Sequence, residues 1–337
     1  MQTKWSARHN LLRVGIGKAF LLLLALIVFA FPAGATQKDK PAKGPQPVGA
    51  VNSGNGGVYE KGKCGIILKY INFTQDQLYD GNDELDFIRP QQGQKPGKKC
   101  YERTTEKYLL TLRAGISENL DARLIIPYLG KETKRQSFNN DFTDSNSGIG
   151  DIKLISRYRI WSQKKKDPFN LAFGLGVKMP TGKTDEEDDS GVRLPAYLQA
   201  GSGSWDPIFE LGAHKIIGRH WISTYFRYKM ATKGELGDRD FEKPDIFKYN
   251  VAYAYALSNL FDLELELNGE VKGKAELDGK KNDNSGGQII YLTPGIHFKF
   301  YKGMHCDVGM PIPVYRDLNG PQLSEDYRII TKLAIKF

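Results

Sequence analysis

Hydrophobic and polar residues alternate with a period of two along several segments of the chain. In residues 261–272 the apolar positions hold Phe261, Leu263, Leu265, Leu267 and Val271, and the alternate positions hold Asp262, Glu264, Glu266, Asn268, Glu270 and Lys272. Residues 326–337 repeat the pattern up to the terminal Phe337. Because an extended strand points successive side chains to opposite faces, each segment has one apolar and one polar face. The pattern predicts strands that separate an apolar medium from water.

Alternation and turn residues together predict about twelve strands. They lie near residues 64–74, 105–116, 121–129, 148–161, 168–179, 205–216, 219–231, 246–258, 261–272, 287–300, 303–314 and 325–337. The connections alternate between tight turns, such as 217–218, and longer polar segments, such as 180–204 and 315–324. Outer-membrane barrels have an even number of strands, short periplasmic turns and longer extracellular loops. We therefore expect an all-β fold, a transmembrane antiparallel β-barrel of about 12 strands.

The N-terminus has the features of a secretory signal peptide. Four basic residues precede the apolar run 19–31, and Ala33-Gly34-Ala35 supplies the small residues of a cleavage site. The run is shorter than the roughly 17 to 25 apolar residues of a transmembrane helix. Residues 36–63 are rich in Lys, Gly, Pro and Asn, a composition typical of flexible segments. We expect a signal peptide at 1–35, a flexible periplasmic lead-in at 36–63, and a barrel at 64–337 in the outer membrane of a Gram-negative bacterium.

The overall charge does not indicate nucleic-acid binding. Removing the four basic residues of the signal peptide from a formal net charge of +9 leaves about +5 for the mature chain. The three cysteines, Cys64, Cys100 and Cys306, fall far apart in the predicted strands, so we expect free thiols. Cysteine and histidine spacings do not resemble a metal site, and 180–184 lacks the first glycine of a phosphate-binding loop. We expect no metal and no cofactor.

Charged residues gather on the side of the strands that would face the lumen. Charges are costly toward lipid but tolerated in a water-filled interior. The charged residues expected to line the lumen are Arg113, Arg157, Arg159, Arg227, Lys229, Asp262, Glu264, Glu266, Glu270 and Lys332. Two interpretations remain open: a narrow hydrated path between an acidic and a basic stripe, or side-chain ladders that pair across the barrel and plug it.

Two further features bear on the barrel wall. Small inward residues such as Ala252 and Ala254 would leave room in the lumen. Aromatic residues at strand ends are expected to form the interfacial girdles. These are Trp161, Phe169, Trp205, Trp221, Phe261, Phe300, Tyr301 and Phe337.

Several stretches resemble the meta-pathway phenol-degradation (MetA-pathway) family of outer-membrane transporters. They are Ser147-Gly-Ile-Gly-Asp-Ile-Lys-Leu154, Lys178-Met-Pro-Thr-Gly-Lys183, Gly201-Ser-Gly-Ser-Trp-Asp-Pro207, Tyr291-Leu-Thr-Pro-Gly295 and the run from Met310 to Leu323. The resemblance extends from about Tyr108 to Phe337. It implies passage of hydrophobic or aromatic compounds across the outer membrane. A purely apolar substrate does not require the strongly charged lumen that this sequence predicts.

Together these observations predict a monomeric, passive outer-membrane channel for small molecules, including aromatic or hydrophobic compounds. Its expected partners are the lipid bilayer, lipopolysaccharide, a small-molecule solute and the barrel-assembly machinery, with no nucleic acid. The alternatives are a plugged barrel with a structural or adhesion role and an outer-membrane lipid-modifying enzyme. The chain lacks the His-x-Ser-Asn-Gly signature of the outer-membrane phospholipase, so we expect no catalytic residues and no enzymatic activity.

Overall fold

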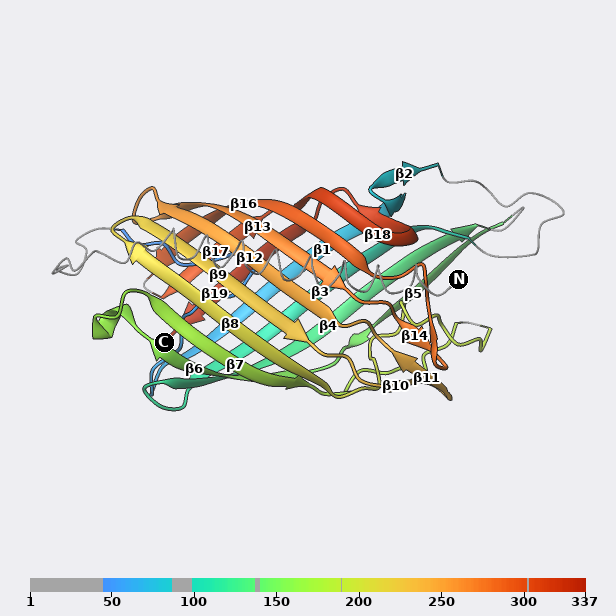
Figure 1. Cartoon of the computed structure of the whole chain (residues 1–337), viewed down its shortest axis with the longest axis horizontal. Coiled ribbons are helices and arrows are strands. Elements are labelled where there is room, and N and C mark those ends of the chain that lie inside the picture. Colours follow the sequence, from blue (N-terminus) through green and yellow to red (C-terminus); the bar gives the residue numbers. More distant parts are fainter. Residues whose placement is uncertain (1–44, 87–98, 137–139, 189, 302) are drawn as a thin grey trace, which may run out of the picture.

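The computed structural model describes residues 45–86, 99–136, 140–188, 190–301 and 303–337. The expected signal peptide and residues 36–44 lie outside the described residues. The described chain forms a closed antiparallel β-barrel with its long axis horizontal in Figure 1. Within this part of the chain, no helix is both long and apolar enough to cross a membrane.

Among the described residues, fifteen strands belong to the sheet of the wall, in which neighbours mostly follow sequence order, and four short strands form a separate sheet. The strands are β1 (Cys64–Gly81), β2 (Asp83–Leu85), β3 (Lys99–Gly115), β4 (Leu120–Gln136), β5 (Asp141–Ile149), β6 (Lys153–Trp161), β7 (Asn170–Lys178), β8 (Asp206–Ile217), β9 (His220–Lys229), β10 (Gly234–Leu236), β11 (Arg239–Glu242), β12 (Ile246–Ala256), β13 (Phe261–Lys272), β14 (Glu276–Leu277), β15 (Lys280–Lys281), β16 (Gly287–Tyr301), β17 (Met304–Gly309), β18 (Ile312–Glu325) and β19 (Ile329–Lys336). The separate sheet consists of β10, β11, β14 and β15. A short 3-10 helix, η1 (Gln163–Lys165), follows β6.

The barrel has twelve strand positions, as the sequence predicts. Two of these positions are each filled by two consecutive strands: β5 and β6 both pair with β4, and β17 and β18 both pair with β16. β1 closes the ring by pairing with β3 on one side and with β18 and β19 on the other. The C-terminus lies at the end with tight turns, and β10, β11 and β14 lie at the opposite end (Figure 1).

The two faces of β13 show why the chain folds in this way. Leu263, Leu265 and Leu267 are 49%, 48% and 44% exposed on the outer face, whereas Glu264 and Glu266 are buried inside. Large apolar side chains exposed in this way around a closed wall form a surface suited to lipid, not water. The predicted facing of this strand is therefore confirmed.

Several strands extend beyond the sequence prediction at the loop-bearing end. β1 continues to Gly81, β3 already begins at Lys99, and β4 continues to Gln136. The segment 315–324, expected to be a loop, is part of β18, so that expectation is wrong. Outside the bilayer both faces of a strand meet water, so the alternation disappears although backbone pairing continues.

Most of the expected girdle residues are exposed at strand ends, but Trp221 is not. Trp161, Trp205 and Phe337 are 41%, 59% and 60% exposed, whereas Trp221 is only 2% exposed. Trp221 pairs across β9 and β12 with Ala254, which is an inward position. The expected girdle position is wrong for Trp221 because alternation along β9, and not nearness to a strand end, decides which way its side chain points; it lies on the same face as Arg227 and Lys229.

Candidate functional site

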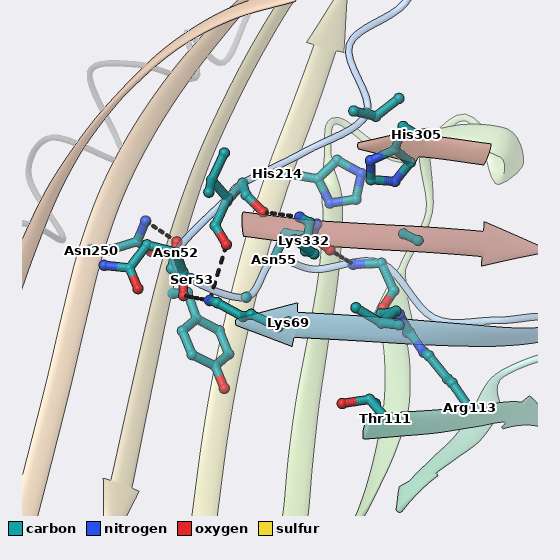
Figure 2. Close-up of a pocket in the computed structure, with 18 of the residues that line it drawn as sticks. Asn52, Ser53, Asn55, Lys69, Thr111, Arg113, His214, Asn250, His305 and Lys332 are labelled. Carbon is teal, nitrogen blue, oxygen red and sulfur yellow. Dashed lines mark hydrogen bonds between the residues drawn. The ribbon is translucent and has the colours of Figure 1, made fainter. Parts of the chain in front are cut away.

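The lumen contains part of the protein's own chain, residues 45–63, which we call the luminal segment. Its composition predicts a flexible periplasmic lead-in, whereas the structure places these residues inside the barrel (Figure 2). Val51 is 1% exposed and packs against inward glycines, and Ala50 forms a buried cluster with Trp221, Ala252 and Ala254. The luminal segment therefore occupies the space that the small side chains of β12 leave in the lumen.

The acidic stripe of β13 binds the backbone N–H groups of the luminal segment. The N–H of Val48 donates to Asp262 (3.1 Å), and the N–H of Val51 donates to Glu264 (3.0 Å). Glu266 accepts from the N–H of Asn52 and from the hydroxyl of Ser53, both at 2.7 Å. These three carboxylates satisfy backbone donors that would otherwise be buried without a partner.

The basic residues bind the carbonyl groups of the same segment. Lys69 donates to the carbonyls of Val51 and Asn52 at 3.1 and 3.0 Å, and Lys332 donates to the carbonyl of Ala50 at 2.7 Å. Figure 2 shows both lysines reaching the segment from the barrel wall.

Three arginines bind residues 55–58 of the luminal segment. Arg113 donates to the carbonyl of Gly57 (2.6 Å), Arg157 to that of Asn55, and Arg159 to that of Val58 (2.5 Å). The luminal segment therefore bridges the acidic and basic stripes. Its backbone N–H groups donate to the acidic side chains, and its carbonyls accept from the basic ones.

Glycines allow the segment to lie directly against the wall. An added Cβ at Gly212 would lie 2.5 Å from the carbonyl oxygen of Asn55, and one at Gly56 would lie 2.8 Å from the carbonyl oxygen of Gly212. A Cβ at Gly54 would meet the ring of Tyr225 at 2.6 Å. Larger residues at these positions would push the segment away from β8 and β9.

The luminal segment leaves the barrel beside charged residues at the periplasmic end. The backbone N–H of Tyr59 donates to Asp121 at 2.7 Å, and Arg113 also bonds to this carboxylate. Glu60 pairs with Lys164 at 2.7 Å. The hydrogen bond from Lys164 lowers the pKa of Glu60, so this carboxylate stays ionised. The segment is thus held at its exit as well as in the lumen.

The other predicted lumen residues also point inward, but they form different contacts. Lys229 pairs with Asp206 at 2.8 Å, and Glu270 pairs with Lys272 at 2.7 Å and with Lys248. Arg227 lines the cavity beyond the luminal segment.

A buried histidine network, absent from the sequence-based candidates, orients part of the acidic stripe. The two ring nitrogens of His297 lie 3.0 Å from Glu264 and 2.9 Å from Asp307. Asp307 also contacts His305 (2.6 Å) and Lys332 (2.5 Å). In the strand register His297 lies opposite Asp262 on β13 and Asp307 on β17. This position between two acidic residues was the feature that could have indicated a buried histidine network.

His297, His305 and Asp307 are close enough together to bind a metal ion, with ligand atoms within 4.8 Å of one another. However, Asp307 already contacts two imidazoles and an ammonium group, and His297 lies between two carboxylates. A cation would have to compete with Lys332 for the same carboxylate. The trio is therefore explained by its own ion pairs and hydrogen bonds.

A cavity of about 890 Å³ adjoins the luminal segment inside the barrel. Its lining includes cationic side chains, among them Lys69, Arg227 and Lys248, and aliphatic ones, among them Ile71 and Leu109. This volume lies within the range of roughly 300 to 1,000 Å³ typical of small-molecule sites.

The extracellular loop 180–204 makes contacts with the upper barrel wall. Lys131 donates to the carbonyl of Gln199 (2.7 Å), and Asn146 donates to that of Leu198 (3.1 Å). Lys243 donates to the carbonyl of Gly201 (2.6 Å), and burial lowers the pKa of Lys243 to about 8. Gln199 is fully buried. The interior is therefore bounded by the luminal segment on one side and by this loop on the other.

An apolar outer belt, a charged interior, short turns at one end and long loops at the other define an outer-membrane β-barrel. Its distinctive feature is the luminal segment. The chain belongs to the family described as "Putative MetA-pathway of phenol degradation", whose model matches residues 101–315. This match confirms the resemblance drawn from the sequence motifs.

One of the similar solved structures, the first below, shows the same fold at low sequence identity. The COG4313 outer membrane channel from Pseudomonas putida F1 is 16% identical, with a TM-score of 0.61, and the match covers 86% of this chain and 100% of that one. The transport unit of the autotransporter AIDA-I from Escherichia coli is 12% identical, with a TM-score of 0.45 and coverage of 82% and 90%. A FadL homologue from Pseudomonas aeruginosa is 7% identical, with a TM-score of 0.41 and the same coverage. A search of curated proteins found no significant match.

Proposed function

We propose that the protein is a passive outer-membrane channel for small molecules, closed at rest by its luminal segment. The observation that carries this proposal is the internal cavity of about 890 Å³ bounded by a peptide that is held mainly through polar contacts. Hydrogen bonds exchange readily with water, so each contributes only about 0.5 to 1.5 kcal/mol net, or about 1.5 to 3 kcal/mol with a charged group. Such a segment can leave its site without unfolding the barrel.

The membership of the family supports aromatic or hydrophobic compounds as solutes, since its description refers to phenol degradation. The similar P. putida structure is described as a channel. We further propose that the protein acts as a monomer, is inserted by the barrel-assembly machinery, contacts lipopolysaccharide in the outer leaflet, and has no catalytic activity.

The second candidate function is a permanently plugged barrel with a structural or adhesion role. The same contacts favour it, because the luminal segment bonds to strands on several sides of the lumen. The two functions differ in whether the segment is ever released.

Planar-bilayer recording of the refolded mature protein separates the candidates. The channel predicts repeated conductance steps above the background of protein-free bilayers. Protein that is folded by heat-dependent migration on SDS gels, yet silent at every voltage, would favour the plugged barrel. Hydrolysis of the lipids during the same experiment would contradict the absence of catalysis.

A further inference from the structure

Positive charge without matching acid is concentrated in the lumen beyond the luminal segment, in the region that we call the chamber. Arg227 on β9 lines the cavity, and Lys107 on β3 and Lys153 on β6 lie beside the lining residues Ile71 and Ile125 in the strand register. Among the described residues, none forms an ion pair with any of these three side chains; Lys107 lies over the ring of Phe73. Glu210 is the cross-strand neighbour of Arg227, but it is bonded to Arg123.

Positive side chains are neighbours in the strand register. Lys153 lies opposite Lys178, and Arg227 lies opposite Lys248. Lys178 and Lys248 have acidic partners, Asp206 and Glu270, whereas Lys153 and Arg227 form no ion pair with any described residue. Like charges in a partly buried space disfavour each other, and an anion placed among them removes that cost. The arrangement therefore favours an anionic ligand.

Aliphatic side chains lie on the same part of the wall as Lys107 and Lys153. Ile71 on β1, Leu109 on β3 and Ile125 on β4 line the cavity. In the ring of strands, β1, β3 and β4 lie across the barrel from β9 and β12, which carry Arg227 and Lys248. Inward aliphatic side chains are unusual in a lumen that holds only water and ions, because interior positions of such barrels are polar. They provide an apolar surface for part of a solute.

We infer that the chamber binds a small organic anion with an apolar ring or short chain, of which an aromatic carboxylate is the simplest example. This inference rests on the proposed channel function, since it names the solute class of the same lumen. A neutral hydrocarbon would leave the cations unpaired, and an inorganic anion would leave the aliphatic side chains in water. An anion with an apolar body satisfies both kinds of side chain at once.

Calorimetric titration of the full mature protein in detergent tests the inference with benzoate, benzyl alcohol and acetate as probes. Benzoate should bind saturably and at least about tenfold more tightly than either of the other two. Arg227→Gln and Lys153→Gln should each weaken benzoate binding about tenfold and leave binding of benzyl alcohol unchanged. Lys183→Gln, at a lysine whose side chain is 74% exposed on an extracellular loop, is the matched control and should change neither.

Three results would overturn the inference. Equal affinity for benzoate and benzyl alcohol would show that the cations are not used, and equal affinity for benzoate and acetate would show that the aliphatic side chains are not used. Unchanged benzoate binding in both glutamine variants would place the anion elsewhere. Osmotic swelling of protein-containing vesicles in glycerol distinguishes a wrong solute class from a wrong channel function. Entry of glycerol without a benzoate preference refutes only the solute class, whereas exclusion of every solute refutes the channel.

Discussion

Replacing Gly212 by valine should release the luminal segment. The new Cβ would lie 2.5 Å from the carbonyl oxygen of Asn55 and 3.1 Å from the backbone nitrogen of Gly56, so the segment has to move. That carbonyl accepts a hydrogen bond from the buried guanidinium of Arg157. Losing a charge-assisted bond costs about 1.5 to 3 kcal/mol. Because about 1.4 kcal/mol is a factor of ten, the ratio of released to bound segment should rise roughly 10- to 150-fold.

Maleimide labelling of a cysteine at Ser53 measures this ratio. The reporter Ser53→Cys is placed in a background without the three native free thiols, Cys64, Cys100 and Cys306. When release and return are fast relative to labelling, the labelling rate follows the released population. Gly130→Ala is the control, because a Cβ there meets its nearest atom at an ordinary 3.5 Å. An unchanged labelling rate in folded Gly212→Val protein would refute the packing argument.

Three other changes test the fold and the luminal contacts. Leu265→Arg should destabilise the barrel by about 2 to 4 kcal/mol in unfolding from lipid vesicles, whereas Val192→Arg on an exposed loop should cost less than about 0.5 kcal/mol; equal losses would contradict the membrane-facing assignment of Leu265. Deleting Phe337, whose backbone exchanges hydrogen bonds with Cys64 at 2.8 and 3.0 Å, should reduce the folded, heat-modifiable form on SDS gels, and normal assembly would count against its role in closing the barrel. Glu266→Gln weakens the acceptor for the backbone N–H of Asn52, the donor that remains once Ser53 is replaced, and should raise Ser53→Cys labelling about tenfold; a rate equal to that of the Ser53→Cys parent would show that this bond does not hold the segment.

The sequence determines the wall of the barrel directly. Every second residue of β13 must meet lipid, so the facing of Leu265 and Glu264 follows from alternation alone. Outside the bilayer no residue has to meet lipid, so alternation no longer marks a strand. The prediction of a loop at 315–324 failed for this reason. The girdle expectation failed for Trp221 for a different reason: nearness to a strand end does not fix the face, whereas the alternation that turns Arg227 and Lys229 inward also turns Trp221 inward. Local pattern gives the faces of a strand, whereas the choice of neighbouring strands is a tertiary property.

The luminal segment could not be predicted from its composition. Few of its residues are apolar, and its backbone is satisfied by side chains far away in the sequence, such as Glu264 for Val51, 213 residues apart. Two observations were nevertheless available: the excess of inward charge on the strands, and the glycine-rich run 53–57, which can fit closely against a wall. Inward carboxylates and guanidinium groups need partners, and a backbone offers donors and acceptors to both.

Locking the luminal segment in place tests whether its release opens the channel. An added Cβ at Gly309 would lie 3.4 Å from the Cβ of Val51, near the separation of about 3.5 to 4.5 Å found in disulfides, so Val51→Cys and Gly309→Cys should form a disulfide in the protein without native thiols. Planar-bilayer recording should find the oxidised protein silent and conductance restored by reductant. The single-cysteine variants should conduct under both conditions. Equal conductance of the oxidised and reduced forms, with the disulfide verified, would contradict the account.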